Sequence, residues 1–322
     1  MSTPLYPLTF RPVFKRYLWG GRRLGTLLGK PIGPEDDYAE SWEVADHPHG
    51  QSVVASGPLA GKTLHELVVQ RPDELLGRCS PLPRFPLMFK FLDCQRDLSV
   101  QVHPDDAAAA RLDPPDLGKT EAWVILHADP GSRVWAGLKA GIDRAALAEA
   151  VRRGRTADCL HWFEPRPGDC IFIPAGTVHA LGAGLVVAEI QQASDTTFRL
   201  YDWDRVGPDG KPRPLHVAEA LAVIDDRRGP VDPVLPQPTD RPQVERLVAC
   251  DKFVLDRWRL KGAAVVGGDD RFHILSVLDG AARLEGLEGP LRRGQTVLLP
   301  ACLGPCALES QDGAVLLEMY LP

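Results

Sequence analysis

The sequence predicts a mainly β protein made of two related β-barrels with a few short helices. Two observations lead to this prediction. Short apolar segments with strand character recur along the chain, and Gly, Pro and Asp separate them at short intervals, as in β-sandwiches and barrels. A segment near the C-terminus also repeats the pattern of an earlier one, a glycine turn followed by a short apolar strand and a Pro-Ala stop.

The expected strands before residue 230 are short and rich in β-branched, aromatic and other apolar side chains, which fit a pleated and partly buried surface. They cover Phe85 to Leu92, Leu98 to His103, Ala122 to Leu126, Cys170 to Ile173, Leu185 to Gln191 and Thr197 to Tyr201.

Three helices are expected to interrupt these strands, over residues 63–76, 144–153 and 216–224. The first has apolar residues at helical spacing. Asp143 is a suitable N-cap for the second, which Gly154 would end. Pro214 introduces the third.

The two barrels would form two domains, over residues 1–230 and 240–322, joined by the proline-rich stretch 229–242. The repeated pattern covers Pro167 to Ala175 and Arg293 to Ala301. It reads as the same strand in each barrel.

Length and composition fit an ordinary globular protein, with 322 residues, 44 % hydrophobic and 25 % charged. The net charge of −6 argues against nucleic acid as a partner, although a small phosphorylated ligand needs only a local cluster of cations. No signal peptide or membrane-length apolar run is evident, so no membrane partner is expected. Seven scattered cysteines are typical of reduced thiols in a cytoplasmic protein. No feature favours one oligomeric state.

Three short segments place polar side chains inside apolar, strand-like sequence. They are Gln101 to Asp106, Gly118 to Trp123 and Pro174 to His179. Residues i and i+2 of a strand point to the same face, so Gln101 and His103 share one face. Lys119 and Glu121 share another, and His179 follows a Pro-Ala-Gly turn. Two imidazoles, a carboxylate and a carboxamide suit a borderline divalent metal, and the lysine adds a cation for an anionic substrate.

Each of these residues also has a structural interpretation. His103 could end a strand while Asp105 or Asp106 caps the next helix, Glu121 could lie on a solvated edge, and His179 could satisfy a turn. The joint pattern favours a metal, because buried polar groups are costly unless they are paired.

Several segments, in this order, resemble the cupin superfamily and, more closely, the type I mannose-6-phosphate isomerases in their short bacterial form. They are Trp19 to Gly21, Glu40 to Glu43, Phe89 to Asp93, Leu98 to Asp106, Gly118 to Trp123, Pro174 to Ala180 and Glu189 to Asp202. The resemblance implies two cupin (jelly-roll) β-barrels, the first bearing the metal. Pro305 stands in the second where the first has His179, so that domain is expected to be metal-free.

The resemblance also implies a zinc-dependent aldose–ketose isomerase that interconverts mannose 6-phosphate and fructose 6-phosphate. One Zn²⁺ per chain would be bound by three residues that match the family's ligands, with Gln101 as a fourth; the three are His103, Glu121 and His179. Arg199 matches the family's catalytic arginine, and Lys119 matches a lysine at the substrate.

Such a reaction would pass through a cis-enediolate, whose negative charge a metal or a cation stabilises. Arg199 would be that fixed cation; its structural alternative is a salt bridge to Asp202 or Asp195. The general base stays open among several residues, Glu189, Tyr201 and Asp202 among them, together with metal-bound hydroxide. The sugar-walling tryptophans would be Trp19, with Trp42 and Trp123.

Two other functions compete with the isomerase. Two histidines and a glutamate also resemble the facial triad of an iron-dependent oxygenase, although Lys119 and Arg199 argue against an apolar substrate. The second alternative is a non-enzymatic sugar-phosphate-binding cupin. A complete set of metal ligands argues against it.

Overall fold

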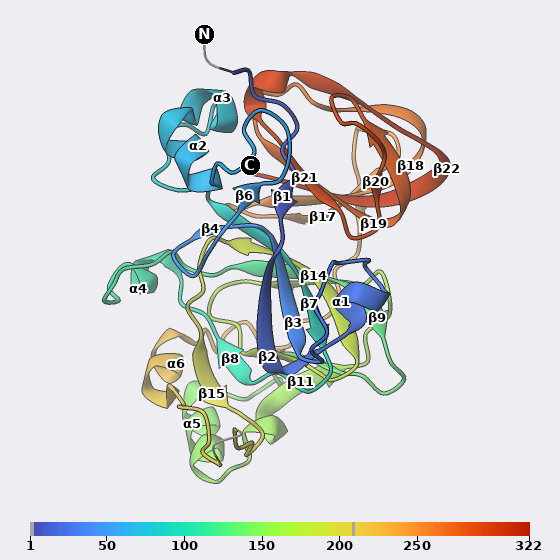
Figure 1. The fold of residues 1–322 in the computed structure, drawn as a ribbon. Coiled ribbons are helices and arrows are strands. Elements are labelled where there is room, and N and C mark those ends of the chain that lie inside the picture. Colours follow the sequence, from blue (N-terminus) through green and yellow to red (C-terminus); the bar gives the residue numbers. More distant parts are fainter. Residues whose placement is uncertain (1–2, 208–209) are drawn as a thin grey trace.

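The computed structural model describes residues 3–207 and 210–322 and is built mainly from three β-sheets (Figure 1). The first is six-stranded, in the order β12-β9-β14-β7-β3-β2. Its strands are β2 (Val13–Gly21), β3 (Tyr38–Val44), β7 (Leu87–Cys94), β9 (Glu121–Ala128), β12 (Cys170–Ile173) and β14 (Leu185–Gln192). The mainly β prediction is therefore confirmed.

The second sheet is five-stranded, in the order β11-β10-β13-β8-β15. Its strands are β8 (Val100–Val102), β10 (Val134–Leu138), β11 (Leu160–Phe163), β13 (His179–Leu181) and β15 (Phe198–Tyr201). Apolar side chains of both sheets form one cluster between them, for example Leu92 and Val187 from the first sheet with Val134 and Leu181 from the second. The two sheets therefore pack face to face, as aligned sheets do around a shared core.

The inner strands of the six-stranded sheet, β7 and β14, are buried on both faces. The other face of this sheet packs against helices and the C-terminal sheet, in a cluster that joins Phe89 and Ile190 to Leu67, Phe272 and Met319. All residues of β7 and β14 are buried, which explains why these strands are continuous apolar runs rather than alternating ones. A charged residue in such a strand must have a partner inside the protein.

Within residues 3–207 and 210–322, six α-helices lie outside the sheets: α1 (Arg23–Thr26), α2 (Leu64–Gln70), α3 (Pro72–Leu76), α4 (Asp106–Ala109), α5 (Arg144–Arg152) and α6 (Val217–Val223). Asp143 caps α5 as expected, its side chain accepting from the amide of Ala146. The single helix expected over 63–76 is wrong: Arg71 separates α2 from α3, because the proline that follows it disfavours helical backbone at that position. The protein also has short 3₁₀ helices over Thr156–Cys159 and Ala301–Leu303.

The third sheet is seven-stranded and is formed by the C-terminal part of the chain; β21 pairs with β19 beside the path β16-β17-β18-β22-β19-β20. Its strands are β16 (Gln237–Pro238), β17 (Val244–Ala249), β18 (Val254–Gly267), β19 (His273–Leu284), β20 (Leu291–Arg292), β21 (Thr296–Leu299) and β22 (Pro305–Tyr320). The long strands curve around an apolar cluster of their own (Figure 1). The two members of the sequence repeat form β12 and β21, so both are strands as expected. The division into barrels over 1–230 and 240–322 stays a prediction.

The segments that connect these sheets are more ordered than the sequence suggested. The stretch 229–242, expected to be a linker, contributes β16, and its Val231 and Val234 amides bond to the carbonyls of Ala136 and Cys170. At the N-terminus, Leu8 and Leu298 exchange two backbone hydrogen bonds of 2.8 Å. Small two-stranded ladders join β1 (Phe10–Arg11) to β6 (Val53–Val54), and β4 (Asp46–His47) to β5 (Gly50–Gln51). No helix in the described ranges is both long and apolar enough to cross a membrane.

A buried histidine in the C-terminal sheet predicts a pH-dependent stability. His273 lies between two carboxylates, with Nε2 2.9 Å from Asp269 Oδ1 and Nδ1 2.7 Å from Glu318 Oε1. Burial opposes protonation of this imidazole, but the two carboxylates outweigh it and raise the pKa of His273 above its usual value. The Nε2–Asp269 contact is a hydrogen bond, whereas Nδ1 and Glu318 Oε1 lie close together without hydrogen-bond geometry, and the two carboxylates together favour the charged ring.

We expect the His273→Gln variant to lose this stabilisation in a pH window set by the raised pKa. A raised pKa stabilises the fold fully below the unfolded value of about 6.5, and the effect disappears as pH rises through the folded pKa. The difference in unfolding free energy between wild type and variant should therefore shrink from pH 6 to pH 9. The change is about 1.4 kcal/mol for every tenfold increase in proton affinity that folding brings. Urea denaturation at each pH measures it. A difference that stays constant or grows with pH would contradict the prediction.

Candidate metal centre and sugar cavity

The three polar segments of the sequence meet between the six-stranded and five-stranded sheets. Within the five-stranded sheet, Gln101 pairs in register with His179 on one side and with Arg199 on the other. His103 follows the end of β8, and Glu121 is the first residue of β9 in the facing sheet. Side chains far apart in the sequence therefore converge because neighbouring strands and facing sheets bring them together.

His103, Glu121 and His179 form a compact, fully buried group. Their ligand atoms all lie within 4.8 Å of one another. His179 Nε2 is 3.2 Å from Glu121 Oε1, and His103 Nε2 is 3.6 Å from Glu121 Oε2. The structure thus brings together the three residues that the sequence selected.

The hydrogen bonds of the two imidazoles fix which nitrogens are free. His103 Nδ1 is 2.8 Å from the carbonyl of Thr196, and His179 Nδ1 is 2.9 Å from the carbonyl of Thr177. A carbonyl only accepts, so each Nδ1 carries the proton. Burial lowers the pKa of His103 well below its usual value and that of His179 to about 3, so both rings are neutral. Both Nε2 lone pairs therefore face Glu121.

In this arrangement the two Nε2 acceptors face the carboxylate oxygens of Glu121, which are also acceptors. Glu121 Oε1 has no hydrogen-bond donor among the described residues, although it is completely buried. Burial raises the pKa of this carboxyl. A divalent cation between the two Nε2 atoms and the carboxylate would satisfy all three groups, and two imidazoles with one carboxylate are a ligand set of catalytic zinc.

Gln101 and Lys119 complete the surroundings of the group. The Gln101 amide nitrogen lies 3.2 Å from His179 Nε2, and rotation of the amide about its last bond presents the oxygen there instead. Lys119 Nζ is 2.8 Å from Glu121 Oε2 and 3.1 Å from His103 Nε2. The buried lysine thus supplies part of the positive charge that this carboxylate needs.

A cavity of about 310 Å³ opens beside this group. Its walls combine aromatic and charged side chains and include Tyr17, Trp19, Glu40, Lys90, Gln101, Lys119, Trp123, His179, Glu189, Asp195, Arg199 and Arg213. Of the expected tryptophans, Trp19 and Trp123 line it. Trp42 does not, because it packs in a separate cluster and donates its indole N–H to Glu40. A cavity of this size with convergent polar groups is typical of a site for a small molecule.

Arg199 lies in the cavity wall as a fixed cation. Its Nε is 3.3 Å from Ser99 Oγ, and its Nη1 donates to the carbonyl of Pro214 at 2.9 Å. The salt bridges to Asp202 or Asp195 considered as its structural role are absent from the described contacts. Asp202 is bound by Arg205 and Arg213, and Asp195 pairs with His49. The remaining N–H donors of Arg199 therefore have no carboxylate partner among the described residues.

The structure separates the three residues considered as a general base. Glu189 lines the cavity and accepts from the Trp123 indole at 3.1 Å, whereas Tyr201 and Asp202 are not among the lining residues. Burial raises the pKa of Glu189, but the charges of Lys90 and Lys119 more than offset this and lower it. Glu189 is thus held as a carboxylate inside the protein.

Lys90 is the buried charged residue that sequence reasoning missed. Its Nζ lies 2.9 Å from Glu189 Oε2 and 3.8 Å from Glu40 Oε2. The signal that could have found it is a lysine in the middle of the otherwise apolar run of β7. Arg213 was also missed, and it lies in an irregular segment that gives no periodic signal.

A second group with metal-ligand side chains lies in the described part of the chain: His47, His49 and Asp195. It is less suited to a metal, because the His47 Nδ1 accepts the backbone amide of His49 at 3.2 Å. In a neutral ring the proton then sits on Nε2, which leaves no free lone pair. His49 is exposed and pairs with Asp195 at 2.9 Å.

Comparisons with known proteins agree with this geometry. Residues 8–117 match the model of the phosphomannose isomerase type I catalytic domain, and residues 243–316 match that of the mannose-6-phosphate isomerase cupin domain. The chain is 38% identical over 312 residues to mannose-6-phosphate isomerase ManA of Bacillus subtilis, covering 94% of this chain and 96% of that protein. It is 35% identical over 298 residues to mannose-6-phosphate isomerase of Streptococcus mutans, covering 91% and 92%.

Among solved structures, the crystal structure of the mannose 6-phosphate isomerase from Bacillus subtilis superposes with a TM-score of 0.89 at 33% identity. The match covers 98% of this chain and 100% of that one. The similarity therefore extends over all three sheets.

Proposed function

The chain belongs to the type I mannose-6-phosphate isomerase family, and we propose that it interconverts D-mannose 6-phosphate and D-fructose 6-phosphate with one zinc ion per chain. The ligands would be His103, Glu121 and His179, with Gln101 as the fourth. The reaction would proceed through a cis-enediolate. A cytoplasmic location is part of the proposal, and the seven unpaired cysteines fit a reducing compartment.

One observation carries the metal assignment. Two neutral imidazoles direct their Nε2 lone pairs at one buried carboxylate, and the ammonium group of Lys119 reaches its Oε2, which leaves Glu121 Oε1 without a donor among the described residues. Such a group is unfavourable unless a cation is bound. Bound there, zinc would supply Lewis-acid stabilisation of negative charge on the sugar oxygens.

The charges of the cavity suit an anionic sugar. Four cations line it, against three carboxylates: Lys90, Lys119, Arg199 and Arg213 against Glu40, Glu189 and Asp195. Three of these cations already have carboxylate partners, since Lys90 binds Glu189, Lys119 binds Glu121 and Arg213 binds Asp202. Arg199 has none among the described residues, and we assign it to the substrate together with Lys119, which the family resemblance places there. Trp19, 6% exposed and stacked on Tyr17, would wall the sugar ring.

The proton that moves between C2 and C1 needs an acceptor close to the sugar. Of the three side chains considered, only Glu189 is in the cavity wall, and we assign the transfer to it. A base must be ionised before it takes a proton, and Lys90 keeps this carboxylate ionised, although the same charge lowers its pKa and so weakens it as a base. Arg199 would stabilise the enediolate charge that forms when the proton leaves.

The purified protein should convert mannose 6-phosphate to fructose 6-phosphate in a coupled assay, and metal analysis should find about one zinc per chain. Stoichiometric iron with oxygen uptake would favour an oxygenase instead. Tight binding of mannose 6-phosphate without turnover in the zinc-loaded protein would favour a sugar-phosphate sensor.

A further inference from the structure

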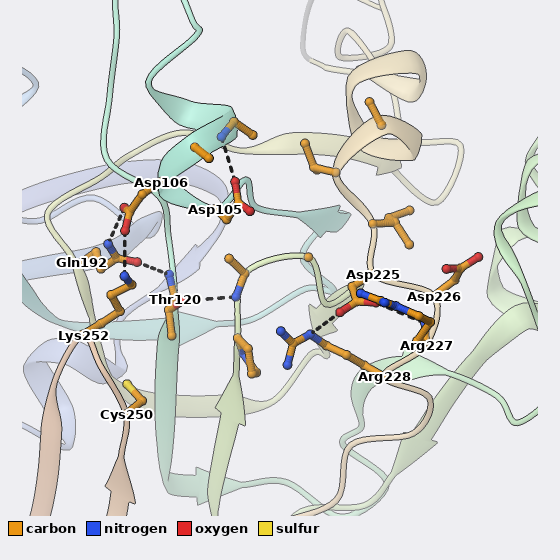
Figure 2. Close-up of a pocket in the computed structure, with 18 of the residues that line it drawn as sticks. Asp105, Asp106, Thr120, Gln192, Asp225, Asp226, Arg227, Arg228, Cys250 and Lys252 are labelled. Atoms are coloured by element: carbon orange, nitrogen blue, oxygen red, sulfur yellow. Dashed lines mark hydrogen bonds and ion pairs between the residues drawn. The ribbon is translucent and has the colours of Figure 1, made fainter.

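We propose that Lys252, in the turn between β17 and β18, is a positioning residue for the metal centre. It acts through a chain of hydrogen bonds that runs from the C-terminal sheet through Asp106, Gln192 and Thr120 (Figure 2). The inference rests on the proposed metal site. It adds residues that are neither metal ligands nor substrate-binding residues in that proposal.

The first link joins the C-terminal sheet to helix α4. Lys252 Nζ lies 2.8 Å from Asp106 Oδ2 and 2.8 Å from Asp251 Oδ2. The turn itself is anchored by Phe253, which is fully buried and packs edge-on against Phe172 of β12 at 6.4 Å. The ammonium group is therefore held by a rigid turn rather than by a free loop.

In the second link, one oxygen of the Asp106 carboxylate contacts Lys252 and the other contacts residues near the metal centre. While Oδ2 receives Lys252, Oδ1 accepts the amide of Gly118 and the side-chain amide of Gln192, each at 2.8 Å. Only glycine allows this close approach at position 118, because a Cβ there would lie 2.5 Å from the Asp106 backbone nitrogen. The lysine thus fixes the rotation of a carboxylate whose other oxygen holds the segment that leads to Glu121.

The third link reaches the metal ligands. Gln192 Oε1 accepts the backbone amide of Thr120 at 3.0 Å, between Lys119 and Glu121. Thr120 Oγ1 in turn accepts the amide of Ala175 at 3.2 Å, in the turn that precedes His179. Figure 2 shows the contacts from Lys252 to Thr120 as a continuous row of dashed lines. Gln192 and Thr120 are buried, so water does not replace their bonds easily.

A relay of this kind should affect metal affinity more than stability. Residues that orient metal ligands typically change affinity or activity 10–100-fold when they are removed. The Lys252–Asp106 pair itself is partly exposed, with 28% and 45% of the side chains accessible, and such pairs contribute little to stability. The two quantities can therefore be measured separately.

The test is the zinc dissociation constant of the full chain, measured by competition with a chromophoric chelator of known affinity. We expect Lys252→Met to raise it severalfold, below the 10–100-fold of a residue bonded directly to a ligand, because Asp106, Gln192 and Thr120 lie between them. Lys252→Arg should recover most of the loss, because it keeps the charge. The control is Lys261→Met, which removes an exposed lysine from β18 and should leave the constant unchanged.

A double-mutant cycle with Asp106→Asn locates the effect. If Lys252 acts through Asp106, the second substitution adds little to the first. An unchanged zinc constant in Lys252→Met would overturn the relay, as would fully additive effects of the two substitutions. A metal-free protein whose unfolding midpoint falls in parallel with its zinc affinity would indicate a structural role and would also overturn it. Failure of the wild type to bind zinc would instead contradict the proposed function.

Discussion

Replacing His179 by alanine is expected to remove the metal and, with it, nearly all activity. His179 is one of two imidazoles that face Glu121, and its ring is already held by the carbonyl of Thr177. Since loss of an orienting partner alone costs 10–100-fold in affinity, loss of a direct ligand should cost at least about 100-fold. Metal content after dialysis and kcat/KM with mannose 6-phosphate measure both effects.

The matched control is His127→Ala, in the same strand as Glu121 but paired with Asp129 at the surface. It should keep full metal content and activity. Chelation of the wild type should abolish turnover while leaving most of the fold, because an apolar cluster surrounds the site. Full metal content and full activity in His179→Ala would show that the ligand assignment is wrong.

The strands around the site could be predicted because local pattern and burial agree there. β12 was expected over its observed range, and β14 differs by one residue at one end. The ligand residues stood out because His103, Glu121 and His179 are polar groups in apolar strand sequence, which is costly without a partner. The family resemblance then supplied their joint role, and the structure places all three within 4.8 Å.

Other features depend on contacts that no local pattern encodes. β2 and β3 carry mixed polar sequence and become strands only because β7 pairs with β3, so they were not predicted. Lys90 was missed because its partner, Glu189, lies about 100 residues further along the chain and is brought beside it only by the pairing of β7 with β14. The contact between Lys252 and Asp106 joins residues far apart in the sequence, so no local pattern pairs them, although Asp106 itself lies in one of the three polar segments.

Replacing Arg199 by alanine is the other change with a large expected effect. The guanidinium lies in the cavity wall, held by Ser99 and Pro214, and has no carboxylate partner among the described residues. A preorganised cation of this kind stabilises charge that exists mainly in the transition state, so its loss should lower kcat far more than it raises KM. The expected loss is on the order of 10²–10³-fold, as when one preorganised electrostatic donor is removed. Steady-state kinetics with mannose 6-phosphate give the split.

The companion variant Arg199→Lys distinguishes charge from geometry. A lysine keeps the charge but not the planar fork that binds Ser99 and Pro214 together, so it should recover little activity. Zinc content should be unchanged in both variants, because the hydrogen bonds of Arg199 within the described ranges go to none of the three ligand residues. Burial and the charge of Arg213 lower the pKa of Arg199, yet the group stays protonated far above neutral pH, so the defect should not depend on pH between 6 and 9. A variant with normal kcat, or one that loses its zinc, would show that Arg199 is not the catalytic cation.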